Sequence, residues 1–158
     1  PIPVSTNTNL SLYSTSKQSN LAGYRAALVA GDQTEIQELL LARKHLGLIV
    51  PAPIQAALAA VLGDDEHVAA QKERYRLRRD VVRSALEAAG FRIDHSEAGL
   101  YLWATRDEDC WDTVSWCAER GVLVAPGSFY GEAGSRHVRV ALTVSDQHAE
   151  AVQDRFLG

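Results

Sequence analysis

Two short apolar segments with a lysine between them constrain the fold of this chain most strongly. Residues 10–13 alternate apolar and polar side chains, and residues 24–30 form a nearly unbroken apolar run closed by Gly31. Alternation predicts a strand with one solvated face, whereas an unbroken apolar run is typical of a strand covered on both faces. We expect the chain between them, which carries Lys17, to be a loop at one end of an α/β sheet.

The next segments predict three helices separated by glycine and proline. The first is capped by Asp32 or Thr34 and ended by Gly47, because a short polar side chain suits a helix start and glycine a helix end. An alanine-rich helix over 54–62 and a long helix over about 66–89 follow. The long helix could span about 35 Å, a length typical of helices that link two lobes.

The remainder predicts a small α+β lobe. We expect four short strands and two helices there, the strands at 91–94, 100–103, 122–125 and 137–142 and the helices at 112–120 and 146–157. Residues 126–134 form a glycine-rich loop between the last two strands. The change in character predicts a domain boundary near residues 48–65.

Composition narrows the class of protein. The chain has 158 residues, 46% of them hydrophobic and 23% charged, and a formal net charge of −4, which is typical of a globular protein and gives no electrostatic reason to expect nucleic acid or membrane as a partner. Cys110 and Cys117 lie two turns apart on one expected helix, about 10 Å, which is too far for a disulfide. We therefore expect reduced cysteines and a cytoplasmic location. The chain has no methionine and begins at Pro1, which is compatible with processing of its start and equally with a sequence that starts inside a longer protein.

Lys17 is the first candidate functional residue. A lysine at a strand end among small hydroxyl residues can be held partly desolvated, which frees its amine to attack a carbonyl. Ser14, Ser16 and Arg25 supply two hydroxyls and a guanidinium, a donor set suited to a phosphate group. We therefore expect a cofactor that carries both an aldehyde and a phosphate, and pyridoxal 5'-phosphate has both.

Arg139 is the second candidate, because it interrupts an otherwise apolar expected strand. A buried guanidinium needs an anion, so we expect Arg139 to bind a substrate carboxylate or, alternatively, to form an ion pair with a residue such as Glu132. We expect all five histidines to be surface or capping residues, and no histidine or cysteine spacing indicates a metal site. The basic residues of the long helix predict a solvated or interdomain face; they are Lys72, Arg74, Arg76, Arg78, Arg79 and Arg83.

Five segments of the sequence, in this order, resemble those of class I/II aminotransferases, which are pyridoxal-phosphate enzymes of fold type I. The segments are residues 14–25, 50–56, 98–103, 124–128 and 138–141. Residues 19–24 and 99–104 are similar to those of the succinyldiaminopimelate aminotransferases of bacterial lysine synthesis. The resemblance covers nearly the whole chain, but only the C-terminal part of such an enzyme.

The resemblance implies a fold, an activity and roles for residues. The fold would be α/β, with residues 1–48 as the end of the large cofactor domain, 49–90 as linking helices and 91–158 as a small C-terminal α+β domain. Lys17 would bind the cofactor aldehyde and move the substrate Cα proton, while Ser14, Ser16 and Arg25 bind the phosphate. Arg139 would bind the α-carboxylate of an amino acid such as glutamate or N-succinyl-LL-diaminopimelate.

The resemblance also implies a homodimer and a missing half of the site. The family places the residues that contact the cofactor ring in the N-terminal half, so we expect these 158 residues alone to bind the cofactor weakly and to transaminate poorly. Two other functions stay open: another fold type I reaction such as a C–S β-lyase, and a non-catalytic fragment or module.

Overall fold

The computed structural model describes residues 9–158, and these form two compact units that meet at Ala70 and Gln71. The first unit begins with an antiparallel pair, β1 (Leu10–Ser14) and β2 (Ala27–Gly31), in which Ser14 lies opposite Ala27. One-turn helix α1 (Thr15–Gln18) and 3-10 helix η1 (Ala22–Tyr24) lie in the connection between these strands. The elements that follow are α2 (Gln33–His45), α3 (Ala52–Leu62) and the start of α4 (Glu66–Ala88).

The connection between β1 and β2 differs from the expected loop and strand. The second strand begins at Ala27, not at residue 24, because residues 22–24 form the 3-10 turn and Arg25 follows with a left-handed φ of 51°. Lys17 lies on the one-turn helix α1 and not in an irregular loop. The expected strand therefore begins three residues too early. β2 can pair only where β1 is still extended, and β1 ends at Ser14.

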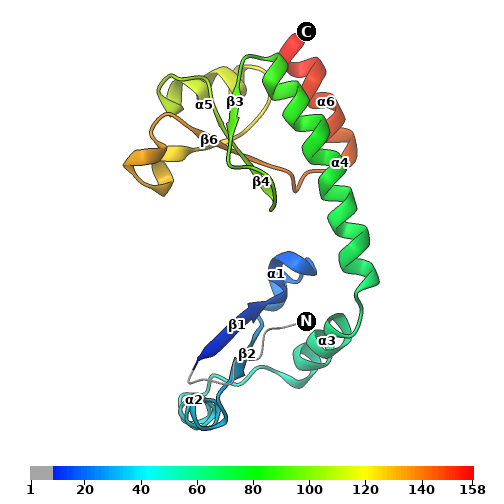
Figure 1. The fold of residues 1–158 in the computed structure, drawn as a ribbon, viewed down its shortest axis with the longest axis vertical. Coiled ribbons are helices and arrows are strands. Elements are labelled where there is room, and N and C mark those ends of the chain that lie inside the picture. The colour runs from blue at the N-terminus through cyan, green and yellow to red at the C-terminus, as the bar shows by residue number, and fades with distance from the viewer. Residues whose placement is uncertain (1–8) are drawn as a thin grey trace. The chain divides into compact units, whose positions relative to one another are not determined.

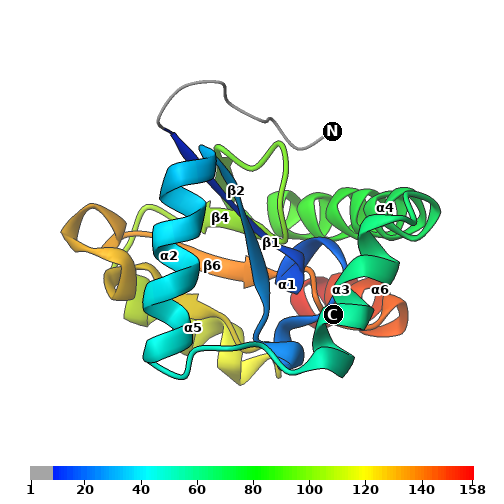
Figure 2. The same cartoon turned by 90° about the horizontal axis from the view of Figure 1, so that it is seen from below.

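The capping of α2 confirms the expected start and end of that helix. The Asp32 carboxylate accepts hydrogen bonds from the amides of Thr34 (2.8 Å) and Glu35 (3.2 Å). At the other end Gly47 has a φ of +70°, and the Leu48 amide donates to the Arg43 carbonyl at 2.9 Å. This backbone reversal satisfies carbonyls that the last helical turn leaves free, and glycine adopts it at low cost. The chain then runs from α2 into α3 (Figure 2).

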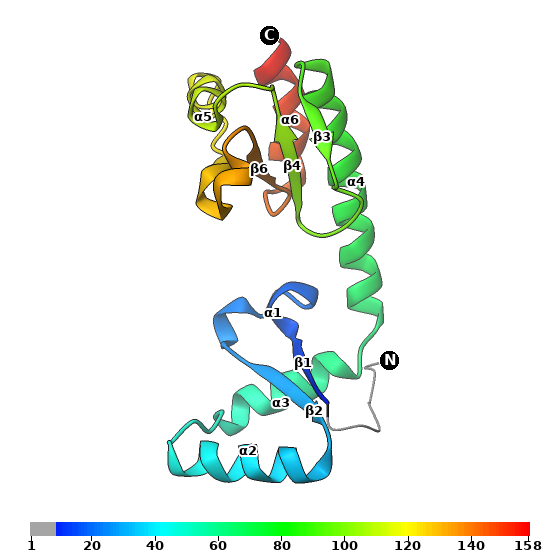
Figure 3. The same cartoon turned by 60° about the vertical axis from the view of Figure 1, so that its left-hand side comes forward.

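The first unit has little core of its own. Among its described residues only Thr15 and Ala26 are buried. Several large apolar side chains are exposed instead; they include Leu12, Leu40, Leu46, Leu48 and Ile49. Figure 3 shows α1 at one end of the β1–β2 ribbon and α2 following from its other end.

The second unit contains a four-stranded antiparallel sheet in the order β3-β4-β6-β5. Its strands are β3 (Arg92–Asp94), β4 (Tyr101–Thr105), β5 (Ala125–Pro126) and β6 (Val138–Ala141). Its other elements are the C-terminal part of α4, α5 (Cys110–Glu119), η2 (Gly127–Tyr130), η3 (Glu132–Gly134) and α6 (Asp146–Leu157). Figure 1 shows α6 beside this part of α4, and Arg78 bonds Asp146 across the two helices.

One face of this sheet forms the core of the second unit. Leu86 of α4, Leu102 of β4 and Leu142 after β6 are fully buried. An aromatic cluster closes the core: the Trp116 ring lies 5.7 Å from that of Phe91 and 5.3 Å from that of Phe156. The helices and the sheet therefore share a single apolar centre. Cys110 and Cys117 belong to it, and neither forms a disulfide.

One expected strand of this unit is much shorter than predicted. We expected a strand at 122–125, but only Ala125 and the next residue, Pro126, pair with β6. The reason is the end of α5, where Gly121 has a φ of +70° and the Val122 amide bonds back to the Cys117 carbonyl at 3.0 Å. The chain is thus still completing the helix end at Val122 and reaches the sheet only at Ala125.

Part of the long helix α4 has the solvated face that its basic residues predict, whereas the side chain of Arg78 is only 12% exposed and bonds Asp146 of α6. Arg76 pairs with Glu73 at 2.7 Å and with Asp80 at 2.8 Å, and all three side chains are exposed. Such i, i+3 and i, i+4 pairs support an exposed helix. Within residues 9–158, the helices are all too short or too polar to cross a membrane.

Candidate functional site

The turn that carries Lys17 is held by its own caps. The Ser14 hydroxyl accepts a hydrogen bond from the Ser16 amide at 3.3 Å, and the Ser19 amide donates to the Thr15 carbonyl at 3.0 Å. Thr15 is buried, whereas Lys17 is exposed. The desolvation that we expected around Lys17 is therefore not present in this chain, and its amine is open to a reagent from solution.

Arg25 lies on the same connection but is not part of a strand. It ends η1 with a φ of 51°, and its Nη1 donates to the Ala22 carbonyl at 3.0 Å. Ser14, Ser16, Lys17 and Arg25 thus all lie on residues 14–25, the stretch that joins β1 to β2. No hydrogen bond within the described part of the chain joins Arg25 to either serine.

The chemistry of this donor set fits the phosphate and aldehyde of pyridoxal phosphate. Two hydroxyls and a guanidinium can donate to a phosphate, and an exposed amine can condense with an aldehyde. The Thr15 hydroxyl oxygen is buried without a hydrogen-bond partner, so this turn also has unused polar capacity. The fit concerns only the phosphate and the aldehyde, because none of the described residues is assigned to bind the pyridine ring.

Arg139 lies on the face of the second unit's sheet that is opposite to its core. In the register of β4 and β6, Arg139 pairs with Trp103, and Tyr101 is two residues from Trp103 on the same face. The neighbours of these residues, Leu102 and Val138, are buried on the core side. Period-two alternation therefore gathers one guanidinium and two aromatic rings on one face.

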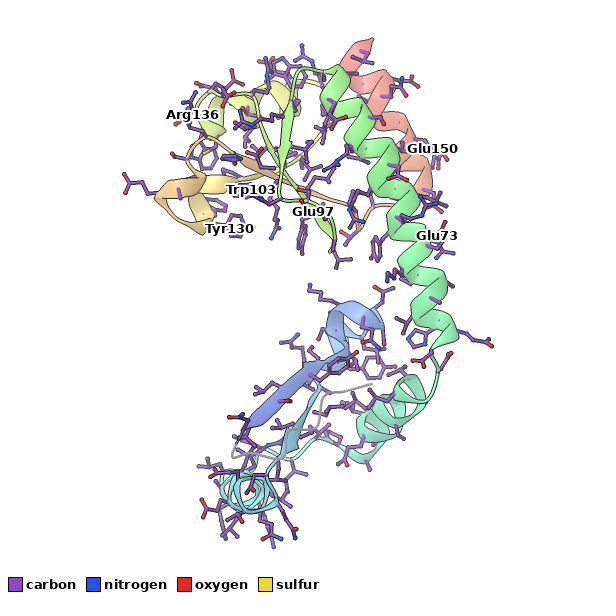
Figure 4. All side chains as sticks on the ribbon, in the orientation of Figure 1. Glu73, Glu97, Trp103, Tyr130, Arg136 and Glu150 are labelled. Carbon is purple, nitrogen blue, oxygen red and sulfur yellow. The ribbon has the colours of Figure 1, made fainter. Side chains whose placement is uncertain are left out.

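An open pocket of about 400 Å³ lies against this face. It is lined by His95, Ser96, Ala98, Tyr101, Leu102, Trp103, Tyr130 and Arg139. The Arg139 guanidinium carbon lies 4.2 Å from the centre of the Tyr101 ring and 5.2 Å from that of Tyr130. Figure 4 shows Trp103 and Tyr130 next to each other, and their rings meet edge to face at 5.8 Å.

Arg139 has no carboxylate partner among the described residues. Its ion pair with Glu132, the alternative that the sequence left open, is not formed. Its Nε is buried and has no hydrogen-bond partner. Because a shielded N–H without an acceptor is costly, the arrangement suits an anionic ligand that reaches the guanidinium from the pocket.

A second group of side chains supports Trp103, and sequence reasoning missed it. The His137 ring stacks on Trp103 at 5.2 Å and contacts the Asp94 carboxylate at 3.0 Å through Nε2. His137 is therefore half-buried and not the surface residue that we expected. Hydrogen bonds from Arg92, and then from His137, lower the pKa of Asp94 to about 2. Alternation in residues 101–104 and the polar residue just before β6 could have indicated this cluster.

Two glycines allow the loop that carries Tyr130 to pack against Trp103. A Cβ on Gly127 would lie 2.2 Å from the Gly134 carbonyl oxygen and 2.9 Å from the Trp103 ring. A Cβ on Gly134 would lie 2.3 Å from the Gly127 carbonyl oxygen. The glycine-rich loop is thus a tightly packed pair of 3-10 turns, and its Tyr130 lines the pocket.

Comparison with known proteins identifies the family. The family Aminotransferase class I and II matches residues 2–156. The 4-dedimethylamino-4-oxo-anhydrotetracycline transaminase OxyQ of Streptomyces rimosus is 56% identical over 147 residues, which cover 93% of this chain and 41% of that protein. LL-diaminopimelate aminotransferase of Dehalococcoides mccartyi is 33% identical over 146 residues, 89% of this chain and 37% of that protein.

Solved structures agree with this result on the fold. The N-succinyldiaminopimelate aminotransferase of Mycobacterium tuberculosis superposes with a TM-score of 0.79 at 24% identity, over 92% of this chain and 40% of that one. The chain belongs to the class I and II aminotransferase family, and its fold is the C-terminal part of a fold type I enzyme. It spans 37–41% of the length of the proteins named above. The expected family and fold class are therefore confirmed.

Proposed function

We propose that the protein is a pyridoxal-phosphate-dependent aminotransferase that transfers an amino group between an amino acid and a 2-oxo acid. The observation that carries this proposal is Arg139, a guanidinium fixed between two tyrosine rings at an open pocket without a carboxylate partner. A carboxylate is the group common to amino acids and 2-oxo acids, and an arginine fork binds it through two hydrogen bonds. Family membership supplies the context in which such a site handles amino groups.

We assign the cofactor to the turn around Lys17. The Lys17 amine would bind the aldehyde, and Ser14, Ser16 and Arg25 would donate hydrogen bonds to the phosphate. Lys17 would also accept the proton from the substrate Cα and return it, the work of a general base and acid. When bound, the cofactor supplies an electron sink for the charge left on Cα, while the protein orients the reacting groups.

Further assignments belong to the same proposal. Residues 1–48 would be the end of the cofactor domain, residues 49–90 would link the domains and residues 91–158 would form the small domain. The cofactor ring would be held by parts of the protein outside these residues, so this chain alone would bind the cofactor weakly. We propose a homodimer in the cytoplasm, a compartment that keeps thiols such as Cys110 and Cys117 reduced.

The substrate pair follows from the relatives only in part. Two of the proteins named above act, by name, on diaminopimelate compounds, and the third acts, by name, on 4-dedimethylamino-4-oxo-anhydrotetracycline. Glutamate and N-succinyl-LL-diaminopimelate are our first candidates, which would place the enzyme in lysine synthesis. A C–S β-lyase reaction is the second candidate function, because Lys17 and its phosphate donors do not distinguish transfer from elimination.

Product analysis after one turnover tests the proposal and separates these functions. The chain and, because it should react poorly alone, a longer protein that contains its residues are each mixed with pyridoxal phosphate and then with glutamate, N-succinyl-LL-diaminopimelate or a cysteine conjugate. We expect loss of the yellow absorbance together with one 2-oxo acid formed per amino group transferred. Release of ammonia and a thiol would indicate the lyase instead. Absence of any product, also from a longer protein that contains these residues, would leave a non-catalytic module.

A further inference from the structure

A hydrogen bond ties the Lys17 turn to a histidine far along the chain. The Ser19 hydroxyl lies 3.0 Å from Nε2 of His67, forty-eight positions away, and the contact is partly buried. Both residues belong to the first unit. Ser19 ends α1 by donating its backbone amide to Thr15, so its hydroxyl is free for this second bond.

His67 is itself held in place by the start of α4. One oxygen of Asp64 accepts the amides of Glu66 at 2.9 Å and His67 at 3.2 Å. The other Asp64 oxygen lies 3.1 Å from Nδ1 of His67, a close polar contact that is not aligned as a hydrogen bond. The backbone bond from His67 is the largest cause that lowers the pKa of Asp64, so this carboxylate stays ionised at neutral pH.

The charge on Asp64 assigns a direction to the bond between His67 and Ser19. An ionised carboxylate accepts and cannot donate, so of the two neutral tautomers of His67 it favours the one with the proton on Nδ1. Nε2 is then the acceptor, and the Ser19 hydroxyl donates to it. The first turn of α4 thereby presents a fixed acceptor to the residue that ends the Lys17 turn.

The Lys17 turn needs such an external contact. A helix of one turn fixes several backbone dihedrals for a single hydrogen bond, so it is unstable unless other parts of the protein hold it. Within the described residues, the Lys17 amine makes no hydrogen bond or ion pair, and Arg25 bends back onto its own turn. Among the described residues, the bond between Ser19 and His67 is the side-chain hydrogen bond that links this turn to α4.

We propose that His67 is a positioning residue for Lys17: through Ser19 it holds the one-turn helix in the conformation that directs the lysine amine toward an aldehyde ligand. This inference rests on the proposed role of Lys17 as the lysine that binds the cofactor. His67 itself would contact neither the cofactor nor the substrate and would act only through Ser19.

Competition among the lysines of one chain tests the inference. The sequence contains three lysines, Lys17, Lys44 and Lys72, and all three are exposed. The chain is treated briefly with pyridoxal phosphate; each amine that reacts forms a carbon–nitrogen double bond and releases water, and borohydride then reduces that bond. Peptide mapping gives the label on Lys17 relative to the other two lysines.

We expect His67→Ala and Ser19→Ala each to lower the preference for Lys17 by about 2- to 10-fold, the range that one hydrogen bond between uncharged groups supports. The double variant should lose no more than either single variant, because both remove the same bond. His67→Gln keeps a polar group at the position of Nε2 and should restore most of the preference. His45→Ala, an exposed histidine of the same unit, is the matched control and should have no effect.

The outcomes separate this inference from the proposed function. If the unaltered chain labels its three lysines equally, the role of Lys17 fails first. If Lys17 is preferred but His67→Ala and Ser19→Ala keep that preference, the inference about His67 is wrong. A variant could also lose helical circular dichroism. The loss of labelling is then local to the Lys17 turn if Lys44 is still labelled as before and His67→Gln restores the label on Lys17.

Discussion

The stacking of Tyr101 on Arg139 leads to a quantitative prediction about carboxylate binding. The guanidinium carbon lies 4.2 Å from the centre of this ring, the closer of its two tyrosines. A cation over an aromatic face contributes about 0.5 kcal/mol when exposed and about 2 kcal/mol when desolvated. Since 1.4 kcal/mol is a factor of ten, Tyr101→Leu should weaken binding of glutamate about 2- to 30-fold.

Nuclear magnetic resonance can measure this effect on the guanidinium itself. The Arg139 Nε–H group has no partner, so its signal should move when a carboxylate binds, and the titration gives the dissociation constant. Tyr101→Phe keeps the ring and should bind within about twofold of the unaltered chain. Tyr75→Leu removes a similar ring, 5.6 Å from Arg78, and should leave the titration unchanged.

Two results would refute the reasoning about this contact. Tyr101→Leu could bind glutamate as tightly as the unaltered chain, in which case the ring does not hold Arg139. Tyr101→Phe could bind as weakly as Tyr101→Leu, in which case the hydroxyl group and not the ring face is responsible.

Three further predictions concern the second unit. All three tryptophans lie in it, so tryptophan fluorescence reports its unfolding. Gly127→Ala should lower the free energy of unfolding by about 1–3 kcal/mol or more, since its Cβ would lie 2.2 Å from a carbonyl oxygen; Glu132→Ala in the same loop should change it by less than about 0.5 kcal/mol. Leu102→Ala should cost about 2–5 kcal/mol because the side chain is 0% exposed, whereas Leu123→Ala, at 89% exposed, should cost almost nothing. Asp94 is held ionised by its arginine partner and then by a histidine, which lower its pKa from 3.8 to about 2. The stability that it contributes is therefore present above pH 4 and is lost as the pH falls toward 2, and Asp94→Asn should flatten the melting temperature across that window.

A different result would contradict each of these three predictions. Equal unfolding free energies for Gly127→Ala and Glu132→Ala would mean that the loop is not packed as described. Equal losses for Leu102→Ala and Leu123→Ala would place the core elsewhere. A melting temperature that falls with pH equally in Asp94→Asn would assign the acid sensitivity to other carboxylates.

Helix ends were the part of the fold that the sequence predicted best. Asp32 and Gly47 bound α2 as expected, because a short carboxylate at the start and a left-handed glycine at the end act over one turn and need no partner from elsewhere. The helix expected at 146–157 has the same bounds in the structure. Local chemistry of this kind can be read from neighbouring residues.

Strand bounds were predicted less well because pairing sets them. The run from Tyr24 looks extended in sequence, but β2 starts at Ala27, where Ser14 of β1 is available as a partner. Residues 122–124 are apolar yet lie outside the sheet, and the amide of Val122 still bonds to the Cys117 carbonyl at the end of α5. An apolar run indicates burial and cannot show where its neighbour begins or ends.

The candidate site was predicted by residue type and not by its surroundings. Lys17 and Arg139 were found because a lone amine and a guanidinium stand out against apolar or hydroxyl neighbours. The tyrosines that hold Arg139 come from β4 and η2 and not from the strand that carries it, so only the fold brings them together. The bond between Ser19 and His67 was missed for the same reason.

The distribution of reduced pyridoxal phosphate over the lysines of the unaltered chain tests the central claim most directly. We predict that Lys17 carries more label than Lys44 and Lys72, and that inorganic phosphate, which competes for Ser14, Ser16 and Arg25, reduces this preference. Equal labelling of all three amines, unchanged by phosphate, would contradict the assignment of this turn to the cofactor.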